Sequence, residues 1–242
     1  MGFWPNGCFA DRHVLISGGT SGIGAAVAKA FLAENARVTV TGVGDLSAAE
    51  RELEGATVRQ LDVRDERAIA ALVAGFDRLD HLVNCAGVIR RGDELQPEVF
   101  ADVVDINLTG TMRLSSAARP LLARQGGTIV NTASMLSFFG GGLVPGYSAS
   151  KGGIAQLTKS LAIAWAGDGI RVNAIAPGWI ETALTQAVRE DEARNRAIAE
   201  RTALKRWGKP DELAGAVLFL CSPLASYVTG TILPVDGGYL AV

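Results

Sequence analysis

The chain has 242 residues, 48% of them hydrophobic, and its 23 Lys and Arg against 25 Asp and Glu give a net charge of −2. A chain of this size and composition can bury a substantial core, so we expect one domain over residues 1–242. Charges of both signs are interspersed, which argues against a nucleic-acid-binding stripe or a polybasic membrane anchor. We therefore expect a small-molecule partner, with no nucleic acid and no membrane.

Cysteine use and the start of the chain favour the cytoplasm. The cysteines are odd in number and lack metal-ligand spacing, which is typical of reduced thiols: Cys8, Cys85 and Cys221. The first seven residues have neither a basic segment nor a long apolar core, and no later segment approaches about 18 uninterrupted apolar residues. The two histidines, His13 and His81, form no ligand pattern, so no metal site is expected.

Short apolar runs alternate along the chain with longer stretches of helical pattern. In chain order, we predict strands at 13–17, 37–41, 57–61, 81–84, 128–132, 170–175 and 231–235. Predicted helices follow at 25–34, 64–74, 97–124, 148–166 and 211–221. This repeated order favours an α/β fold of the Rossmann-like, doubly wound type. Such a fold has a parallel sheet, helices on both faces and a ligand at the carboxyl ends of the strands.

Glycines follow the first predicted strand directly. Gly18, Gly22 and Gly24 lie between that strand and an alanine-rich helical stretch. Glycines let the backbone approach a pyrophosphate, while the amides and the positive dipole end of the helix face the anion. The spacing Gly-x-x-x-Gly-x-Gly departs from the common G-x-G-x-x-G fingerprint. An ordinary turn is the alternative, but the order of strand, glycines and helix favours a dinucleotide site.

A second pattern lies near the middle of the chain. Tyr147 and Lys151 are four residues apart in a predicted helix, and Ser134 lies thirteen residues before Tyr147. Side chains four apart share one helix face, so the ammonium group can approach the phenol. A free Tyr has a pKa of about 10, and a nearby cation lowers it towards a useful acid and base. The alternative is an amphipathic helix with a half-buried Tyr and a solvated Lys.

Together these motifs resemble the short-chain dehydrogenase/reductase family over about residues 13–238. The family's glycine, Asn-Asn-Ala-Gly and Pro-Gly-x-x-x-Thr motifs fall on Gly18, Gly22, Ile23, Gly24, Asn84, Cys85, Ala86, Gly87, Pro177, Gly178 and Thr182, and all of these residues except Cys85 match. Its four catalytic positions fall on Asn107, Ser134, Tyr147 and Lys151. Cys85 departs from the motif, because the family usually has a second Asn there.

The resemblance implies a mechanism and an assembly. Tyr147 would donate a proton to a carbonyl oxygen as hydride arrives from the nicotinamide, and Ser134 would polarise that oxygen. Lys151 would also reach the nicotinamide ribose, and Asn107 would help to hold a water-linked proton relay. The family further implies a homotetramer in which residues 97–124 and 148–166 pack across a two-fold interface.

Binding residues are also implied by the resemblance. Those expected to bind the dinucleotide are Gly18, Ser21, Gly22, Ile23, Gly24, Gly42, Asp62, Val63, Asn84, Ala86, Gly87, Tyr147, Lys151, Pro177, Gly178, Ile180 and Thr182. Asp62 and Val63 would border the adenine. The substrate is expected to meet Arg90, Ser134, Met135 and Tyr147, with a substrate loop at about 180–202.

The choice between NAD and NADP depends on the end of the second strand. An acidic residue there binds the ribose 2′-hydroxyl of NAD, whereas a basic residue accommodates the phosphate of NADP. The position is occupied by Gly42, and residues 18–24 and 41–45 contain no Arg or Lys. Asp45 either reaches the ribose or caps a helix at 46–53. We therefore expect NAD rather than NADP.

A finer resemblance concerns the substrate. Residues 84–91, 132–145, 206–208 and 236–241 are similar to the family's bacterial 2-dehydro-3-deoxy-D-gluconate 5-dehydrogenases, also called 2-deoxy-D-gluconate 3-dehydrogenases. The resemblance implies interconversion of a secondary alcohol and a ketone on a sugar acid. Arg90 or Arg91 would then clamp the carboxylate, since Arg binds such groups bidentately. The alternative for these two residues is a solvated Arg, or an ion pair with Asp93 or Glu94.

Three other functions remain open. The first is a polyol dehydrogenase on the same scaffold. The second is a 3-oxoacyl-carrier-protein reductase, which would bind its acidic partner through a basic patch made by Arg90, Arg91, Lys205 and Arg206. The third is a non-catalytic dinucleotide-binding sensor, against which the intact Asn, Ser, Tyr and Lys set argues.

Overall fold

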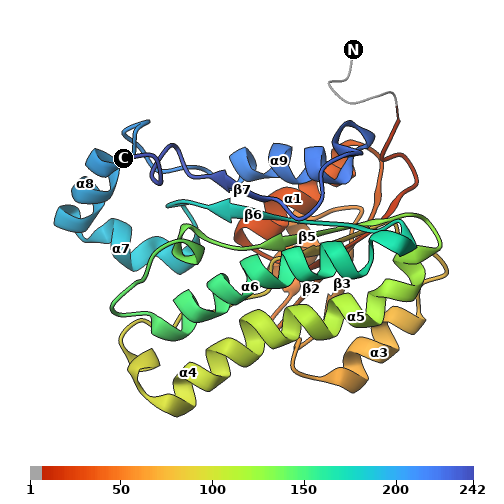
Figure 1. Cartoon of the computed structure of the whole chain (residues 1–242), viewed down its shortest axis with the longest axis horizontal. Helices are drawn as coiled ribbons and strands as arrows, with labels where there is room; N and C mark the ends of the chain where they lie inside the picture. Colours follow the sequence, from red (N-terminus) through yellow and green to blue (C-terminus); the bar gives the residue numbers. More distant parts are fainter. Residues whose placement is uncertain (1–6) are drawn as a thin grey trace.

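A parallel sheet of seven strands, in the order β3-β2-β1-β4-β5-β6-β7, forms the centre of the molecule (Figure 1). The computed structural model describes residues 7–242, so residues 1–6, where we expect no export signal, lie outside it. The strands are β1 (His13–Ser17), β2 (Arg37–Gly42), β3 (Thr57–Gln60), β4 (His81–Asn84), β5 (Thr128–Thr132), β6 (Arg171–Pro177) and β7 (Ile232–Val235). The predicted doubly wound sheet is confirmed, with strand ends within one or two residues of those expected.

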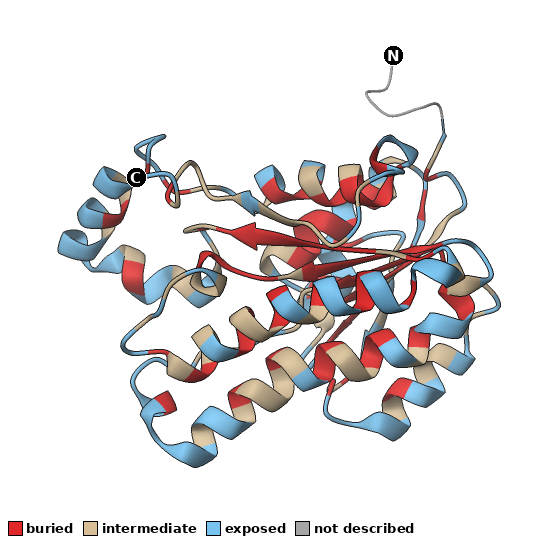
Figure 2. Cartoon of the chain, in the orientation of Figure 1, coloured by how far each residue is buried: buried red, intermediate tan, exposed pale blue. Residues whose placement is uncertain are grey.

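Helices cover both faces of the sheet because its strands are apolar on both sides. In β1, Val14 and Ile16 belong to one core, whereas Leu15 belongs to the core of the opposite face. The first core also contains α1 (Gly22–Ala33), α2 (Ser47–Glu52) and α9 (Asp211–Cys221). The second contains α3 (Glu66–Ala74), α5 (Gly110–Ala123) and α6 (Pro145–Ala164). Figure 2 shows buried residues on the sheet and on the helix sides that face it.

The helix predicted at 97–124 is interrupted in the structure. It consists of α4 (Pro97–Val104), a π-helical turn η2 (Asp105–Thr109) and α5. A π turn adds a residue to the helical turn and is frequent at functional sites. Here it carries Asn107, whose side chain is held by contacts with distant segments. Local periodicity does not reveal such contacts, so the sequence predicts one continuous helix.

Residues 180–202, predicted as a loop, contain two helices and a short 3₁₀ turn. These are η5 (Ala183–Thr185), α7 (Gln186–Glu190) and α8 (Glu192–Arg201). Asp191 caps α8, because its Oδ1 accepts a hydrogen bond from the Arg194 backbone N–H at 3.1 Å. Figure 1 shows α7 and α8 beyond the carboxyl end of β6. Within residues 7–242, no helix is both long enough and apolar enough to cross a lipid bilayer.

Candidate active site

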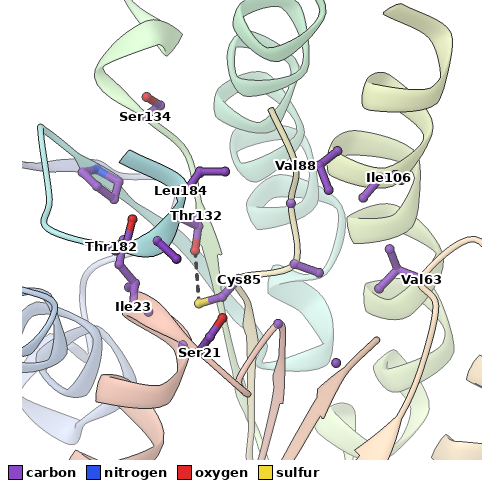
Figure 3. Close-up of a pocket in the computed structure, with 18 of the residues that line it drawn as sticks. Ser21, Ile23, Val63, Cys85, Val88, Ile106, Thr132, Ser134, Thr182 and Leu184 are labelled. Carbon is purple, nitrogen blue, oxygen red and sulfur yellow. Dashed lines mark hydrogen bonds between the residues drawn. The ribbon is translucent and has the colours of Figure 1, made fainter. Parts of the chain in front are cut away.

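A cavity of about 550 Å³ opens at the carboxyl ends of the strands. The strand order reverses beside β1, where β1 pairs with β2 on one side and with β4 on the other. In open α/β sheets, ligands bind in the crevice at this reversal. Figure 3 shows Thr182 and Leu184 on one side of the cavity and Val88 and Ile106 on the other.

The glycine loop forms the floor of the cavity near α1. Gly18 has a φ of +64°, and a Cβ atom there would lie 2.6 Å from the Ala86 backbone nitrogen. A Cβ atom on Gly24 would collide with the Gly18 carbonyl oxygen. The first turn of α1 lines the cavity, and no side-chain hydrogen bond from Ser21 caps it. Free helix N–H groups beside backbone without side chains fit a dinucleotide pyrophosphate.

Ser134, Tyr147 and Lys151 meet in the same cavity, as the sequence predicts. The Lys151 Nζ lies 5.5 Å from the centroid of the Tyr147 ring and donates a 2.6 Å hydrogen bond to the Thr132 carbonyl oxygen. The side chains of Tyr147 and Ser134 are hydrogen-bonded to each other. The Ser134 Oγ also accepts from the Leu136 N–H at 3.1 Å, which fixes the direction of the hydroxyl.

The pKa of Tyr147 differs from the expectation. Burial raises it above the usual value, the hydrogen bond with Ser134 lowers it, and the charge of Glu94 raises it further. Burial also lowers the pKa of Lys151, to about 8. The prediction that Lys151 lowers the pKa of Tyr147 is therefore wrong for this structure, because desolvation of the phenolate outweighs the favourable interactions. Tyr147 is consequently protonated near neutral pH, the form that donates a proton.

Asn107 lies behind the cavity wall and is fully buried. Its Oδ1 accepts from the Val88 N–H at 2.8 Å, and its Nδ2 donates to the Val88 carbonyl at 3.0 Å and to the Ser150 Oγ at 3.1 Å. A Cβ atom on Gly87 would lie 3.3 Å from the Asn107 Oδ1 and 3.7 Å from the Lys151 Nζ. The Asn107 side chain thus joins the segment after β4 to α6. Its part in a proton relay stays a prediction.

All but one of the residues predicted to bind the dinucleotide line the cavity. The exception is Asn84, which is buried within the structure and donates to the Asn131 Oδ1 at 2.9 Å and to the Ser115 Oγ at 3.1 Å. These partners lie on neighbouring elements, so Asn84 has a structural role that its motif does not reveal. Of the predicted substrate residues, Met135 is buried and does not line the cavity.

Arg64 lines the cavity, although the sequence analysis does not predict it as a site residue. It pairs with Asp62 at 2.6 Å and with Asp102 at 2.8 Å, and the hydrogen bond from Arg64 lowers the pKa of Asp62. The signal that could have identified Arg64 is its place just after β3, since ligands bind at the carboxyl ends of the strands. Ala183, Leu184 and Thr185 line the cavity from within the predicted substrate loop. The other lining residues that were not predicted are Thr20, Val43, Leu61, Cys85, Val88, Ile106, Thr132 and Ala133.

Arg90 lies at the exposed side of the cavity. Glu94 contacts the backbone of Arg90 and forms no ion pair with its side chain. The Glu94 Oε1 accepts a hydrogen bond from the Arg90 backbone N–H at 2.7 Å. Arg91 is close enough to Arg194 for the second cation to lower its pKa, although burial is the larger cause.

The predicted basic patch is incomplete. Arg206 forms an ion pair with Glu212 at 2.6 Å, and the Lys205 Nζ donates to the Glu200 carbonyl at 2.6 Å. Neither Lys205 nor Arg206 lines the main cavity. The ion pair with Glu212 neutralises the charge of Arg206, which an acidic carrier protein would need for binding.

Comparisons with known proteins place the chain in a family. Residues 18–240 match the family model described as enoyl-(acyl carrier protein) reductase. The chain is 43% identical to the 2-dehydro-3-deoxy-D-gluconate 5-dehydrogenases of Pseudoalteromonas atlantica, over 95% of this chain and 96% of that one, and of Bacillus subtilis, over 95% of each. It is 31% identical to the solved gluconate 5-dehydrogenase of Burkholderia cenocepacia in complex with NADP and tartrate, with a TM-score of 0.91 over 98% of each chain. These matches span nearly the whole chain and agree with the site, and the chain belongs to the short-chain dehydrogenase/reductase family.

Proposed function

We propose that this chain interconverts a secondary alcohol and a ketone on a sugar acid such as 2-dehydro-3-deoxy-D-gluconate or 2-deoxy-D-gluconate. As a member of its family, it is an oxidoreductase that acts on alcohol groups with NAD(P). One observation carries the proposal: the glycine loop, the Ser134, Tyr147 and Lys151 side chains and Arg90 all line a single cavity. That arrangement offers a dinucleotide site, a proton donor and a cation for a carboxylate.

The bound dinucleotide supplies or takes up the hydride. In the reductive direction, Tyr147 donates its phenolic proton to the substrate oxygen, and Ser134 donates a hydrogen bond to the same atom. In the oxidative direction, the Tyr147 phenolate accepts the proton of the alcohol. Lys151 holds the ribose hydroxyls and keeps a positive charge beside the phenol. The first turn of α1 and the loop from Gly18 to Gly24 bind the pyrophosphate.

We assign the carboxylate of the substrate to Arg90. The relatives that are 43% identical carry the name of a sugar-acid dehydrogenase, and Arg90 lies on the cavity. Residues 180–202 form the other side of the substrate site in this proposal, since Ile180 and Ala183 to Thr185 line the cavity while α7 and α8 extend beyond it.

Arg90→Met is expected to lower kcat/KM for 2-dehydro-3-deoxy-D-gluconate by about 10- to 100-fold, because charged hydrogen bonds contribute about 1.5–3 kcal/mol. A neutral polyol should be affected little, since it has no carboxylate. Arg91→Met is the matched control. Steady-state kinetics on both substrate classes measure the effect. Equal wild-type activity on acid and polyol would favour a polyol dehydrogenase, and turnover of acetoacetyl thioesters alone would favour a carrier-protein reductase.

We also propose that NAD is used in preference to NADP. β2 ends at Gly42, where a Cβ atom would collide with the Thr20 side chain. A larger residue is therefore excluded there, including a basic one that could pair with a 2′-phosphate. Arg64 already pairs with Asp62 and Asp102, which leaves less of its charge for a 2′-phosphate. Against the proposal, the similar structure from Burkholderia cenocepacia contains NADP. Asp45 does not line the cavity, and its Oδ1 accepts the Ser47 N–H at 2.9 Å at the start of α2.

Parallel kinetics with the two dinucleotides test this preference, and wild-type kcat/KM is expected to be higher with NAD. Gly42→Asp is unsuitable as a probe because of the collision with Thr20. Val43 follows β2, lines the cavity and is 65% exposed. Val43→Arg should raise kcat/KM for NADP about tenfold by supplying a phosphate partner, whereas Val43→Gln should not. A wild-type preference for NADP would contradict the proposal.

We further propose a cytoplasmic homotetramer. Family resemblance supports the assembly, with α4, α5 and α6 at a two-fold interface. Phe100 on α4 is 36% exposed and Ile163 on α6 is 80% exposed, and both would gain from burial between subunits. Free thiols at the three cysteines are compatible with a reducing compartment. Light scattering on the purified protein measures the number of chains per particle.

A further inference from the structure

Glu94 is a carboxylate buried beside the active site. It belongs to η1 (Asp93–Leu95), after β4, and is 1% exposed. Both of its oxygens accept backbone hydrogen bonds: Oε1 from the Arg90 N–H and Oε2 from the Tyr147 N–H, each at 2.7 Å. Buried carboxylates are rare unless such partners stabilise them. One side chain therefore joins the segment that carries Arg90 to the residue proposed as the proton donor.

The hydrogen bond from the Tyr147 N–H to Glu94 also provides a partner for a backbone donor in the first turn of α6. Tyr147 is the third residue of this helix, so its N–H has no partner inside the helix. A carboxylate at a helix N-terminus is further stabilised by the helix dipole. Gly146 allows the approach, because a Cβ atom there would lie only 3.3 Å from the Glu94 Oε2 and 3.2 Å from the Phe100 Cα.

A second hydrogen bond joins the same two segments nearby. The Gly92 N–H donates to the Leu143 carbonyl oxygen at 2.8 Å. The Glu94 N–H donates to the Arg90 carbonyl oxygen at 3.1 Å, which closes the turn on itself. The turn that contains Glu94 is thus fixed at both ends. Because the turn is rigid, its position determines where the backbones of Arg90 and Tyr147 lie.

We propose that Glu94 is a positioning residue that fixes Arg90 and Tyr147 relative to each other, and thereby places the reacting carbon of the substrate at the phenol. The proposal rests on the function proposed above and deepens it, because it assigns a role to the distance between the carboxylate clamp and the proton donor. A displacement of about 1 Å in such a constellation can cost about 100-fold in rate.

Glu94 also acts on Tyr147 through its charge. The groups that face Tyr147 are the Ser134 hydroxyl from the end of β5, the Lys151 ammonium on α6 and the Glu94 carboxylate from η1. Among them, the negative charge of Glu94 raises the pKa of Tyr147. Removing that charge should lower the pKa, so the phenolate that accepts the alcohol proton should form at lower pH.

The test compares two substitutions of Glu94 with a neighbouring control. Glu94→Ala removes both hydrogen bonds and is expected to lower kcat/KM by about 10- to 100-fold. Glu94→Gln keeps the size of the side chain but removes the charge and, because its amide nitrogen cannot accept, one of the two hydrogen bonds. We therefore expect a smaller fall in kcat/KM than in Glu94→Ala, with the rising limb of the pH profile for alcohol oxidation moved to lower pH. Asp93→Asn removes the same charge from the exposed neighbour and should leave both the rate and the limb unchanged. Dinucleotide affinity should stay within about twofold of wild type in all three.

A second readout needs no turnover. The ultraviolet titration of the Tyr147 phenol, taken as the difference from Tyr147→Phe, should shift in the same direction in Glu94→Gln. If Glu94→Ala does not fold, Gly146→Ala supplies a milder displacement of the carboxylate at unchanged charge, with reduced kcat/KM and no shift of the pH limb expected. Unchanged rate and titration in Glu94→Gln, or an equal shift in Asp93→Asn, would overturn the proposal. Failure of the sugar-acid assignment would appear separately, in the wild-type protein.

Discussion

Tyr147→Phe is expected to lower kcat by about 100- to 10,000-fold, the usual effect of removing a positioned acid. The ring remains, so its packing beside Lys151 is preserved, while the hydroxyl that bonds to Ser134 is lost. Dinucleotide binding should be retained, because the glycine loop and the start of α1 are untouched. Steady-state kinetics in both directions and calorimetric titration of the dinucleotide measure these two properties.

Tyr227→Phe is the matched control, since Tyr227 is fully exposed and lies outside the cavity. It should retain wild-type turnover. Near-normal turnover in Tyr147→Phe would show that another group moves the proton, and the proposed mechanism would then be wrong. Loss of dinucleotide binding in this variant would instead show that the phenol holds the cofactor.

Lys151→Met is expected to impair both the reaction and the binding of the dinucleotide. The ammonium group is 5.5 Å from the centroid of the Tyr147 ring, so its removal takes away the cation that lies beside the phenol. It also removes the donor proposed to hold the ribose hydroxyls. We expect kcat/KM to fall by about 100-fold or more, with dinucleotide affinity about tenfold weaker, as for the loss of a charged hydrogen bond.

Lys159→Met removes a positive charge from an exposed position on the same helix and should change neither property. Calorimetry gives the affinity, and single-turnover kinetics give the hydride step. If affinity is unchanged in Lys151→Met, the ribose contact is refuted. If the hydride step is unchanged, the electrostatic role is refuted.

Local patterns in the sequence determined the framework of this protein. Apolar runs and helical periodicity depend on neighbouring residues, so the seven strands and their parallel direction were predictable. The spacing of Tyr147 and Lys151 placed both side chains on one helix face. Gly18 and Gly24 were predictable because a close backbone approach after a strand admits no side chain. Most of the residues that were matched to family motifs also line the cavity.

Only the tertiary structure decided the properties that depend on distant partners. Arg64 reaches the cavity from beyond a third strand, while Asn84 turns into a buried hydrogen-bond network. The pKa of Tyr147 is raised because burial, which the sequence does not show, outweighs nearby stabilising groups. Glu94 acquires its contacts with Tyr147 across 53 residues of chain. Folding brings these groups together through long-range packing, which local spacing does not encode.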